Sequence, residues 1–345
     1  MKKKQTTIRD IARQLGISHS TVSRALSENP KESALVMEKT RKRVEQKAAE
    51  MDYRPNLMAR GISTGKTGTL GLLTYEISHE PSSRQTDQIL RAADRQNYQI
   101  VMGLATNRLH MARLDNQIKH IKQLLSRGID GLLIHTRGDQ GESERILDAV
   151  GGRVPVVTFH DPTPNLSGVV LDETTGFCEA TEHLIQLGHE RIGFIGSDWN
   201  KSVVGSAKAK GYLLVMQKRG LIPKRIPDYL FAEEPVYQLS KGLSIESFTA
   251  FVCRDDYVAI DVCRGLGELG LRVPEDVAVV GNDDIDVAAR MTPALTTLAI
   301  PYEEIAEMAM DLILEQLQGQ DEPRHIVLES PLVVRESCGA NISEK

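Results

Sequence analysis

Residues Thr7–Leu26 read TIRDIARQLGISHSTVSRAL, and this stretch predicts two short helices joined by a tight turn. Gly16 ends the first helix because glycine adopts the positive φ that such a turn requires, and Ser18 is a suitable N-cap for the second. Apolar residues recur at helical spacing on both sides of the turn. They are Ile8, Ile11, Ala12, Leu15, Val22, Ala25 and Leu26.

The outward face of the second helix carries His19, Ser20, Ser23 and Arg24. Short polar groups and one guanidinium are the chemistry that reads base edges in the major groove of DNA. The alternative is a pair of ordinary core helices. The charge distribution argues against that alternative.

Positive charge is concentrated at the start of the chain. Residues 1–60 hold 14 Lys and Arg against 7 Asp and Glu, whereas the remainder holds 28 against 40. A solubilising tail would explain Lys2, Lys3 and Lys4 but not the basic run at 39–43. A basic head on an acidic body predicts a polyanionic partner that the head alone binds.

The bulk composition describes a soluble protein of more than one domain. The 345 residues are 41% apolar and 26% charged, enough for a small head and a larger body that splits into two lobes. Four scattered cysteines indicate free thiols in a reducing compartment. No signal-peptide pattern and no 18-residue apolar run occur, so we expect a cytoplasmic protein that does not span a membrane.

The rest of the head is expected to form a loop, a helix and a linker. Asn29-Pro30 predicts a loop over 27–31, and a third helix should run through Val44 to Tyr53 before Pro55 ends it. Asn56 begins a segment too short to be helical in water, which we expect to order only on a partner. Gly65-Lys66-Thr67 lacks the first glycine of a phosphate-binding loop.

From residue 69 onward, apolar runs alternate with helical patterns, which predicts parallel α/β sheets in two lobes. The expected strands are 69–74, 99–103, 131–135, 154–159, 169–171, 192–196, 249–253, 277–281 and 297–300. The expected helices are 85–96, 114–126, 176–187, 207–219, 256–269 and 302–317. Ligands bind beyond the carboxyl ends of such strands. That rule selects Tyr75, His135, His160, Asp255 and Asp283.

Nothing in the body predicts catalysis or a cofactor. Gly265–Gly270 satisfies G-x-G-x-x-G, but it ends a predicted helix, whereas a dinucleotide site must open one after a strand. No nucleophile elbow or metal cluster accompanies it. We therefore expect neither an enzyme, nor a metal site, nor a cofactor.

Several motifs together resemble the LacI/GalR family of bacterial transcription regulators. In the head these are TIRDIA, TVSRAL and YRPNLMAR (53–60), and in the body ATEHLIQLGH (180–189), VPED (273–276), VGNDDI (280–285), PALTT (293–297) and LVVRES (332–337). The resemblance covers nearly the whole chain. It implies a helix-turn-helix head at 1–55 and a hinge at 56–67. It also implies a body of two periplasmic-binding-protein-like lobes, 68–165 with 300–325 and 166–299 with 326–345.

The resemblance also implies a homodimer that binds double-stranded operator DNA. By position, His19, Ser20 and Arg24 would read bases, while Ser18, Thr21 and Ser23 would mostly contact phosphates. Ile62 stands where a hinge leucine wedges into the minor groove. The remaining expected DNA contacts are Thr7, Asn56 and Ala59.

In the body, the family implies a small-molecule effector between the lobes. Asp283 matches an aspartate that binds ligand hydroxyls, Lys208 replaces the usual arginine, and Asp255 and His160 occupy an asparagine and an aspartate position. Tyr75 and His135 complete the expected set. Loss of a guanidinium and gain of carboxylate favour a sugar-like or amine-bearing effector over a phosphate or carboxylate. Whether the effector releases or strengthens DNA binding stays open.

Two other function classes are possible on such a scaffold. A sugar-binding module without regulatory work would resemble a periplasmic receptor, but the missing signal peptide and the basic head argue against it. An enzyme on an α/β scaffold lacks the motifs described above. A ligand-responsive transcription regulator is therefore the leading hypothesis.

Overall fold

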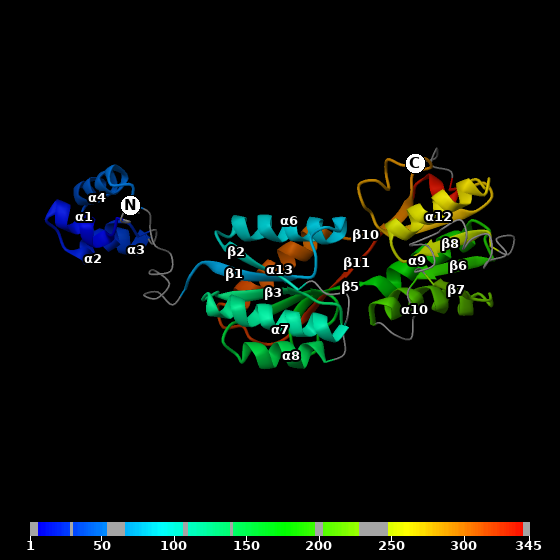
Figure 1. Cartoon of the computed structure of the whole chain (residues 1–345), viewed down its shortest axis with the longest axis horizontal. Helices are drawn as coiled ribbons and strands as arrows, with labels where there is room; N and C mark the ends of the chain where they lie inside the picture. The colour runs from blue at the N-terminus through cyan, green and yellow to red at the C-terminus, as the bar shows by residue number, and fades with distance from the viewer. Residues whose placement is uncertain are drawn as a thin grey trace. The chain divides into compact units, whose positions relative to one another are not determined.

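A computed structural model of the chain describes residues 6–27, 30–53, 66–105, 110–138, 141–196, 203–227 and 248–340. The chain divides into two compact units, a head at Met1–Thr67 and a body at Gly68–Lys345 (Figure 1). No helix within the described ranges is long and apolar enough to cross a membrane.

The head opens with the expected helix pair, α1 (Ile8–Leu15) and α2 (His19–Ala25). Gly16 adopts φ +63° between them, the left-handed conformation that the turn requires. The Thr7 hydroxyl and backbone N–H both contact the Asp10 carboxylate, which forms a capping box at the start of α1. The Ser18 hydroxyl accepts the Thr21 N–H and caps α2 as predicted.

A small apolar core joins these helices to α4 (Glu38–Glu50). Ile11, Val22 and Val44 are completely buried in it. The prediction of a loop through residue 31 was wrong at its end, because Pro30–Ser33 forms one helical turn, α3. Proline is acceptable at the first position of a helix, where its missing N–H costs nothing.

The first lobe of the body is a parallel six-stranded sheet covered on both faces by helices (Figure 1). Helices α6 (Glu80–Arg95) and α13 (Tyr302–Gln316) pack on one face, and α7 (His110–Ser126) and α8 (Glu142–Val150) on the other. The strands, in spatial order, are β11 (His325–Glu329), β5 (Ser167–Asp172), β4 (Val156–His160), β3 (Gly131–His135), β1 (Thr69–Thr74) and β2 (Gln99–Leu104).

The second lobe repeats this architecture with one antiparallel edge. Helices α9 (Glu173–Gln186) and α10 (Val203–Lys218) cover one face, and α12 (Asp256–Glu268) covers the other. The strands, in spatial order, are β12 (Leu332–Val333), β10 (Thr296–Ala299), β9 (Ala278–Asp283), β8 (Ala250–Cys253), β6 (Ile192–Gly196) and β7 (Lys224–Pro227). A short 3₁₀ helix, Glu336–Cys338, follows β12.

The chain crosses between the lobes three times, and two crossings differ from the expected boundaries. Strand β5 pairs with β4, so the first lobe extends to Asp172 and not only to 165. Strand β11 pairs with β5, so the last crossing lies between β11 and β12 and not at 325–326. Helix α8 and strands β7, β11 and β12 were not predicted. Three of them are short or lie at a sheet edge, where apolar patterning is weak.

Helix α4 offers a test of local capping. Its N-cap is Met37, whose side chain makes no capping hydrogen bond and is 79% exposed. Met37→Ser should accept one of the first N–H groups of α4 and stabilise the head by about 1 kcal/mol. Met37→Ala is the matched control, since it removes the same side chain without adding an acceptor. Chemical denaturation of the 1–67 head should show M37S more stable than M37A; equal midpoints would contradict the capping argument.

Candidate functional sites

The outward face of α2 presents the residues expected to read DNA. His19, Ser20, Ser23 and Arg24 are all exposed. Within the described part of the head, the side chains of His19, Ser23 and Arg24 have no hydrogen-bond or ion-pair partner. Ser18 and Thr7 are occupied with capping, and Thr21 is half-buried beside the Ser18 hydroxyl. Asn56, Ala59 and Ile62 lie outside the described residues.

Five of the six expected effector residues lie at the carboxyl ends of strands. His135 ends β3, His160 ends β4 and Asp283 ends β9. Tyr75 directly follows β1, and Asp255 follows β8 as the N-cap of α12. Lys208 comes from α10. The sheet geometry therefore brings residues from both lobes toward one another, as the strand-end rule predicts.

The first lobe contributes aromatic and imidazole rings to the candidate effector site. The rings of Tyr75 and His135 are 5.6 Å apart, and those of His135 and His160 are 5.2 Å apart. Below them, the Tyr75 hydroxyl donates to Glu142 at 2.6 Å, and the Gln117 amide donates to the same carboxylate oxygen at 2.7 Å. Both Glu142 and Gln117 are buried. The position of Tyr75 is thus fixed by its hydroxyl as well as by ring packing.

Three ion pairs adjoin one another where the lobes meet. The Lys208 ammonium lies 3.2 Å from Glu173 Oε1, and both side chains are buried. The Arg254 guanidinium lies 2.9 Å from Asp255, and His160 Nδ1 lies 3.4 Å from Asp161. Lys208 also donates to the Arg254 carbonyl at 3.0 Å, which links two of the pairs. We call Glu173, Lys208, His160, Asp161, Arg254, Asp255 and Asp283 the charged cluster.

Burial and charge set the protonation of this cluster. Burial opposes charge on Lys208, but the carboxylates of Glu173, Asp283 and Asp255 outweigh it and raise the lysine pKa. Burial raises the pKa of Asp283 well above its ordinary value, although the Lys208 charge acts against it. Burial thus shifts Asp283 toward its protonated form, and a protonated carboxyl can donate a hydrogen bond as well as accept one.

The two histidines titrate in opposite directions. Burial lowers the pKa of His135 well below 6.5, and the charges of His160 and Arg137 act in the same direction. Burial also works against charge on His160, but its hydrogen bond to Asp161 and the charges of Asp161 and Glu173 raise the pKa. His135 is thus a neutral donor and acceptor, while His160 is the imidazole that more readily carries charge.

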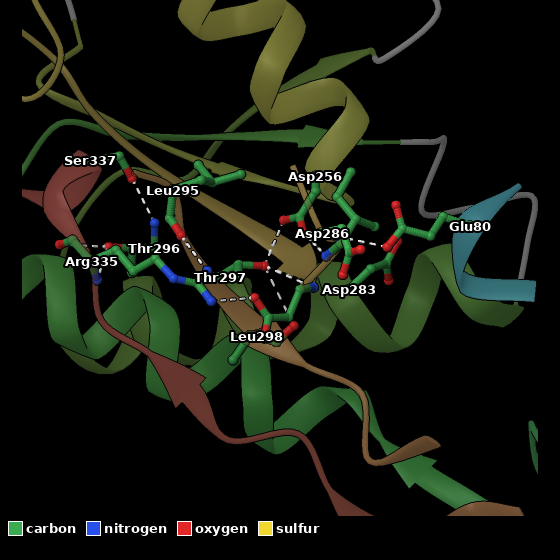
Figure 2. A network of polar contacts seen from close by, with 12 residues as sticks. Glu80, Asp256, Asp283, Asp286, Leu295, Thr296, Thr297, Leu298, Arg335 and Ser337 are labelled. Carbon is green, nitrogen blue, oxygen red and sulfur yellow. Dashed lines mark hydrogen bonds and ion pairs between the residues drawn. The ribbon is translucent and has the colours of Figure 1, made fainter. Parts of the chain in front are cut away.

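The loop after β9 connects the cluster to the first lobe. Glu80 at the start of α6 accepts the Asp286 N–H at 2.7 Å (Figure 2). Arg84 donates to the Asp284 carbonyl at 2.7 Å. The Tyr302 hydroxyl donates to the Asp283 carbonyl at 3.3 Å. Both α6 and α13 belong to the first lobe. Hydrogen bonds from the first lobe therefore hold residues 283–286 of the second lobe, and this segment begins with the expected effector residue Asp283.

Beneath this loop lies a buried carboxylate, Asp256. It accepts the Thr297 hydroxyl at 2.6 Å and the Ile285 N–H at 2.9 Å, part of the network in Figure 2. A Cβ at Gly281 would lie 2.1 Å from Asp256 Oδ1, so the strand needs glycine there. Burial raises the pKa of Asp256 to about 6, although the Thr297 hydrogen bond acts against the shift.

Sequence reasoning missed several residues of the site. Glu173, Asp161 and Arg254 form half of the ion pairs, and Glu142 and Gln117 hold Tyr75. Arg254 had a usable signal, because it immediately follows the predicted strand 249–253, and Glu173 lies two residues beyond the predicted strand 169–171. Gln117 and Glu142 lie on helices, so no strand-end rule selects them.

The structure also bears on the features that sequence reasoning dismissed. The G-x-G-x-x-G stretch lies across the end of α12, and Gly270 adopts φ +75° after it. The four cysteines, all within the described ranges, are free. No group of three or more potential metal ligands occurs among the residues that the structure describes.

Comparison with known proteins finds matches for both the head and the body. Residues 7–56 match the family model described as bacterial regulatory proteins, lacI family, and residues 181–338 match the periplasmic binding protein-like domain. The ribose operon repressor of Haemophilus influenzae is 29% identical over 336 residues, which cover 96% of this chain and 98% of the relative. The chain belongs to the LacI family.

Solved structures of LacI-family proteins extend the comparison to the fold. The lac repressor dimer bound to operator and an anti-inducer superimposes with a TM-score of 0.87 and 25% identity, covering 98% of this chain and 100% of that one. The transcriptional regulator CelR in complex with cellobiose gives a TM-score of 0.67 at 25% identity, with 96% and 100% covered. This LacI-family protein is a DNA-binding transcription regulator controlled by an effector, and it is not an enzyme.

Asp256 generates a pH prediction for this regulator. Because its folded pKa of about 6 exceeds the unfolded value of 3.8, its contribution to stability is present below pH 4 and is lost as the pH rises through 6. Asp256→Asn should remove this contribution, since the amide oxygen can keep the Ile285 N–H and the amide nitrogen can donate to Thr297. The difference in unfolding free energy between wild type and D256N should therefore change by about 3 kcal/mol between pH 4 and 7.

Thr297→Val provides the matched control. It removes a hydrogen bond that lowers the Asp256 pKa, so the loss of stability should move to higher pH. Denaturant titrations of the three proteins across this pH range check the sign. Parallel stability curves for wild type and D256N would show that folding does not shift the pKa of Asp256.

Proposed function

We propose that this regulator is a repressor that binds a pseudo-palindromic operator as a homodimer and is controlled by a neutral, sugar-like effector held between the lobes. The observation that carries the proposal is the charged cluster. Its two cations, Lys208 and Arg254, are each paired with a carboxylate, and the His160 imidazole lies beside Asp161. A neutral ligand is therefore favoured over a phosphate or a carboxylate, which would need an uncompensated cation.

The donors and acceptors of the cluster suit hydroxyl groups. Among the residues that the structure describes, the buried Glu173 Oε2 has no hydrogen-bond partner. Burial raises the pKa of Asp283, which favours the protonated form that can donate. His135 and Tyr75 add ring surface on the first-lobe side. Sugars combine hydroxyls with apolar faces, so this lining matches both parts of such a molecule. Support from relatives is the cellobiose complex of CelR and the name of the ribose operon repressor.

The head would read DNA through α2. His19, Ser20 and Arg24 are proposed to contact base edges, because they are exposed on one helix face. Ser23 would contact phosphate, together with the helix-capping residues Ser18, Thr21 and Thr7. Asn56, Ala59 and Ile62 are proposed to act at the hinge. The dimer is proposed by analogy with the lac repressor dimer on its operator.

The loop at 283–286 suggests how effector and DNA binding communicate. An effector that contacts the Asp283 carboxyl acts on the residue whose carbonyl is bound by Tyr302 of the other lobe. If the effector favours one arrangement of the lobes, and that arrangement also sets the spacing of two heads, the two affinities are coupled by the same factor. A measured change in operator affinity gives the direction of that coupling.

Removing the head tests the division of labour. The 68–345 body should retain effector binding and lose operator binding, because the exposed face of α2 lies in the head. Fluorescence anisotropy with an operator selected from random duplexes would measure DNA binding, and calorimetry with a panel of neutral sugars would measure effector binding. Specific operator binding by the isolated body would refute the assignment. So would a full chain whose operator affinity no sugar of the panel changes.

Substitution of Arg24 tests base reading. Arg24→Ala should weaken operator binding about 10- to 100-fold while random DNA binding changes little, because a bidentate base contact contributes about 1–3 kcal/mol. Arg43, which is exposed on α4, is the matched control. Arg43→Ala should weaken both DNAs alike and reduce the slope of log affinity against log salt by about 1. The same loss on both DNAs for Arg24→Ala would count against its role.

A further inference from the structure

Inside the charged cluster, Lys208 forms an ion pair with Glu173. The resemblance to the family placed Lys208 at a position where arginine is usual, but it predicted no carboxylate partner for it. The Lys208 ammonium lies 3.2 Å from Glu173 Oε1, and the two side chains are only 13% and 4% exposed. Glu173 is the first residue of α9, immediately after the chain leaves the first lobe. The lysine charge is therefore compensated from within the protein before any effector arrives.

The second oxygen of Glu173 points to a ligand. Glu173 Oε2 is buried and has no hydrogen-bond partner within the described residues. A buried carboxylate oxygen without a donor loses free energy that a ligand hydroxyl would restore. On the other side of the pair, the Lys208 ammonium has three protons, of which the Glu173 carboxylate and the Arg254 carbonyl occupy two. The Lys208 ammonium thus offers a hydrogen-bond donor next to the acceptor oxygen Glu173 Oε2.

We propose that Glu173 determines the charge of the effector, by neutralising Lys208 so that the pair binds two neighbouring hydroxyls of a neutral ligand and rejects anions. This inference rests on the proposed function but concerns a residue outside the expected effector set. An anion placed near Lys208 would also lie near Glu173 Oε2. Like charges at that separation repel strongly in a buried site, so the carboxylate acts as a filter.

The groups around the pair reinforce the filter. Asp161 and His160 approach from β4, and Asp255, Asp283 and the Arg254 carbonyl from the second sheet. The basic groups among them have their own carboxylates, since His160 lies beside Asp161 and Arg254 pairs with Asp255. Removing the charge of Glu173 therefore leaves Lys208 as the one cation of the cluster whose nearest carboxylate partner is gone.

The test uses the full chain and inorganic sulfate, which needs neither the natural effector nor DNA. Glu173→Gln keeps the shape of the side chain and removes its charge. At constant ionic strength, calorimetric titration should show a sulfate site in E173Q at least tenfold tighter than any in wild type. Sulfate bound by the basic head is common to both proteins and cancels in the comparison.

Glu182→Gln is the matched control. It removes a carboxylate from the same helix, where Glu182 pairs with Arg219 instead of Lys208. E182Q should bind sulfate like wild type, and Glu173→Asp, which keeps the charge, should too. Adding Lys208→Met to E173Q should abolish the new site. If wild type binds sulfate as tightly as E173Q, or E182Q gains as much, the proposal is overturned.

A reverse variant keeps the inference testable should E173Q fold poorly. Lys208→Met leaves Glu173 without its cation, so a probe that carries an ammonium group beside hydroxyls, D-glucosamine, should gain affinity over D-glucose by tenfold or more relative to wild type. No change in that ratio would refute the pairing role of Glu173. Failure of the proposed function would appear separately, as a wild-type chain that binds no operator and no neutral sugar.

Discussion

The body depends on holding a lysine ammonium out of water at the meeting point of its two lobes. A buried cation is costly unless carboxylates and carbonyls surround it, and Lys208 has Glu173 at 3.2 Å and the Arg254 carbonyl at 3.0 Å. These partners come from α9 and from the end of β8, so the requirement ties together elements that are distant in the sequence. Removing either charge of the pair leaves the other without its nearest partner of opposite charge.

The head satisfies its polar groups by a different and more local route. Its hydroxyls mostly serve the helix ends, since Thr7 pairs with Asp10 and Ser18 with Thr21. These caps fix α1 and α2 and leave the side chains of His19 and Arg24 without intramolecular partners in the described head. A helix whose ends are satisfied internally can present its outer face to another molecule at little conformational cost. The capping residues thus support recognition even where they contact no base.

The sequence predicts most of the architecture and only part of the site. Helical spacing around Gly16 and alternating apolar runs located the head and nine of the twelve strands in the described part of the chain, because burial on both faces gives parallel strands continuous apolar stretches. Lobe membership of β5 and β11 could not be derived, since it depends on which sheet edge a strand joins. Strand ends selected Asp283 and His160, but the partner of Lys208 on another helix follows only from three-dimensional packing.

Two of the expected effector residues have an unusual backbone. His160 adopts φ +90° and Asp283 φ +115°, conformations that cost on the order of 1–3 kcal/mol each for residues other than glycine. Both are the last residue of a strand, His160 of β4 and Asp283 of β9. At Asp283 the conformation allows the carbonyl to accept from Tyr302 while the carboxyl stays among the charges near Lys208. One residue therefore contacts the opposite lobe through its backbone and the cluster through its side chain. A ligand that binds the Asp283 carboxyl therefore changes the interactions that stabilise this strained backbone conformation. The hydrogen bond between the Asp283 carbonyl and Tyr302, which joins the lobes, changes with it.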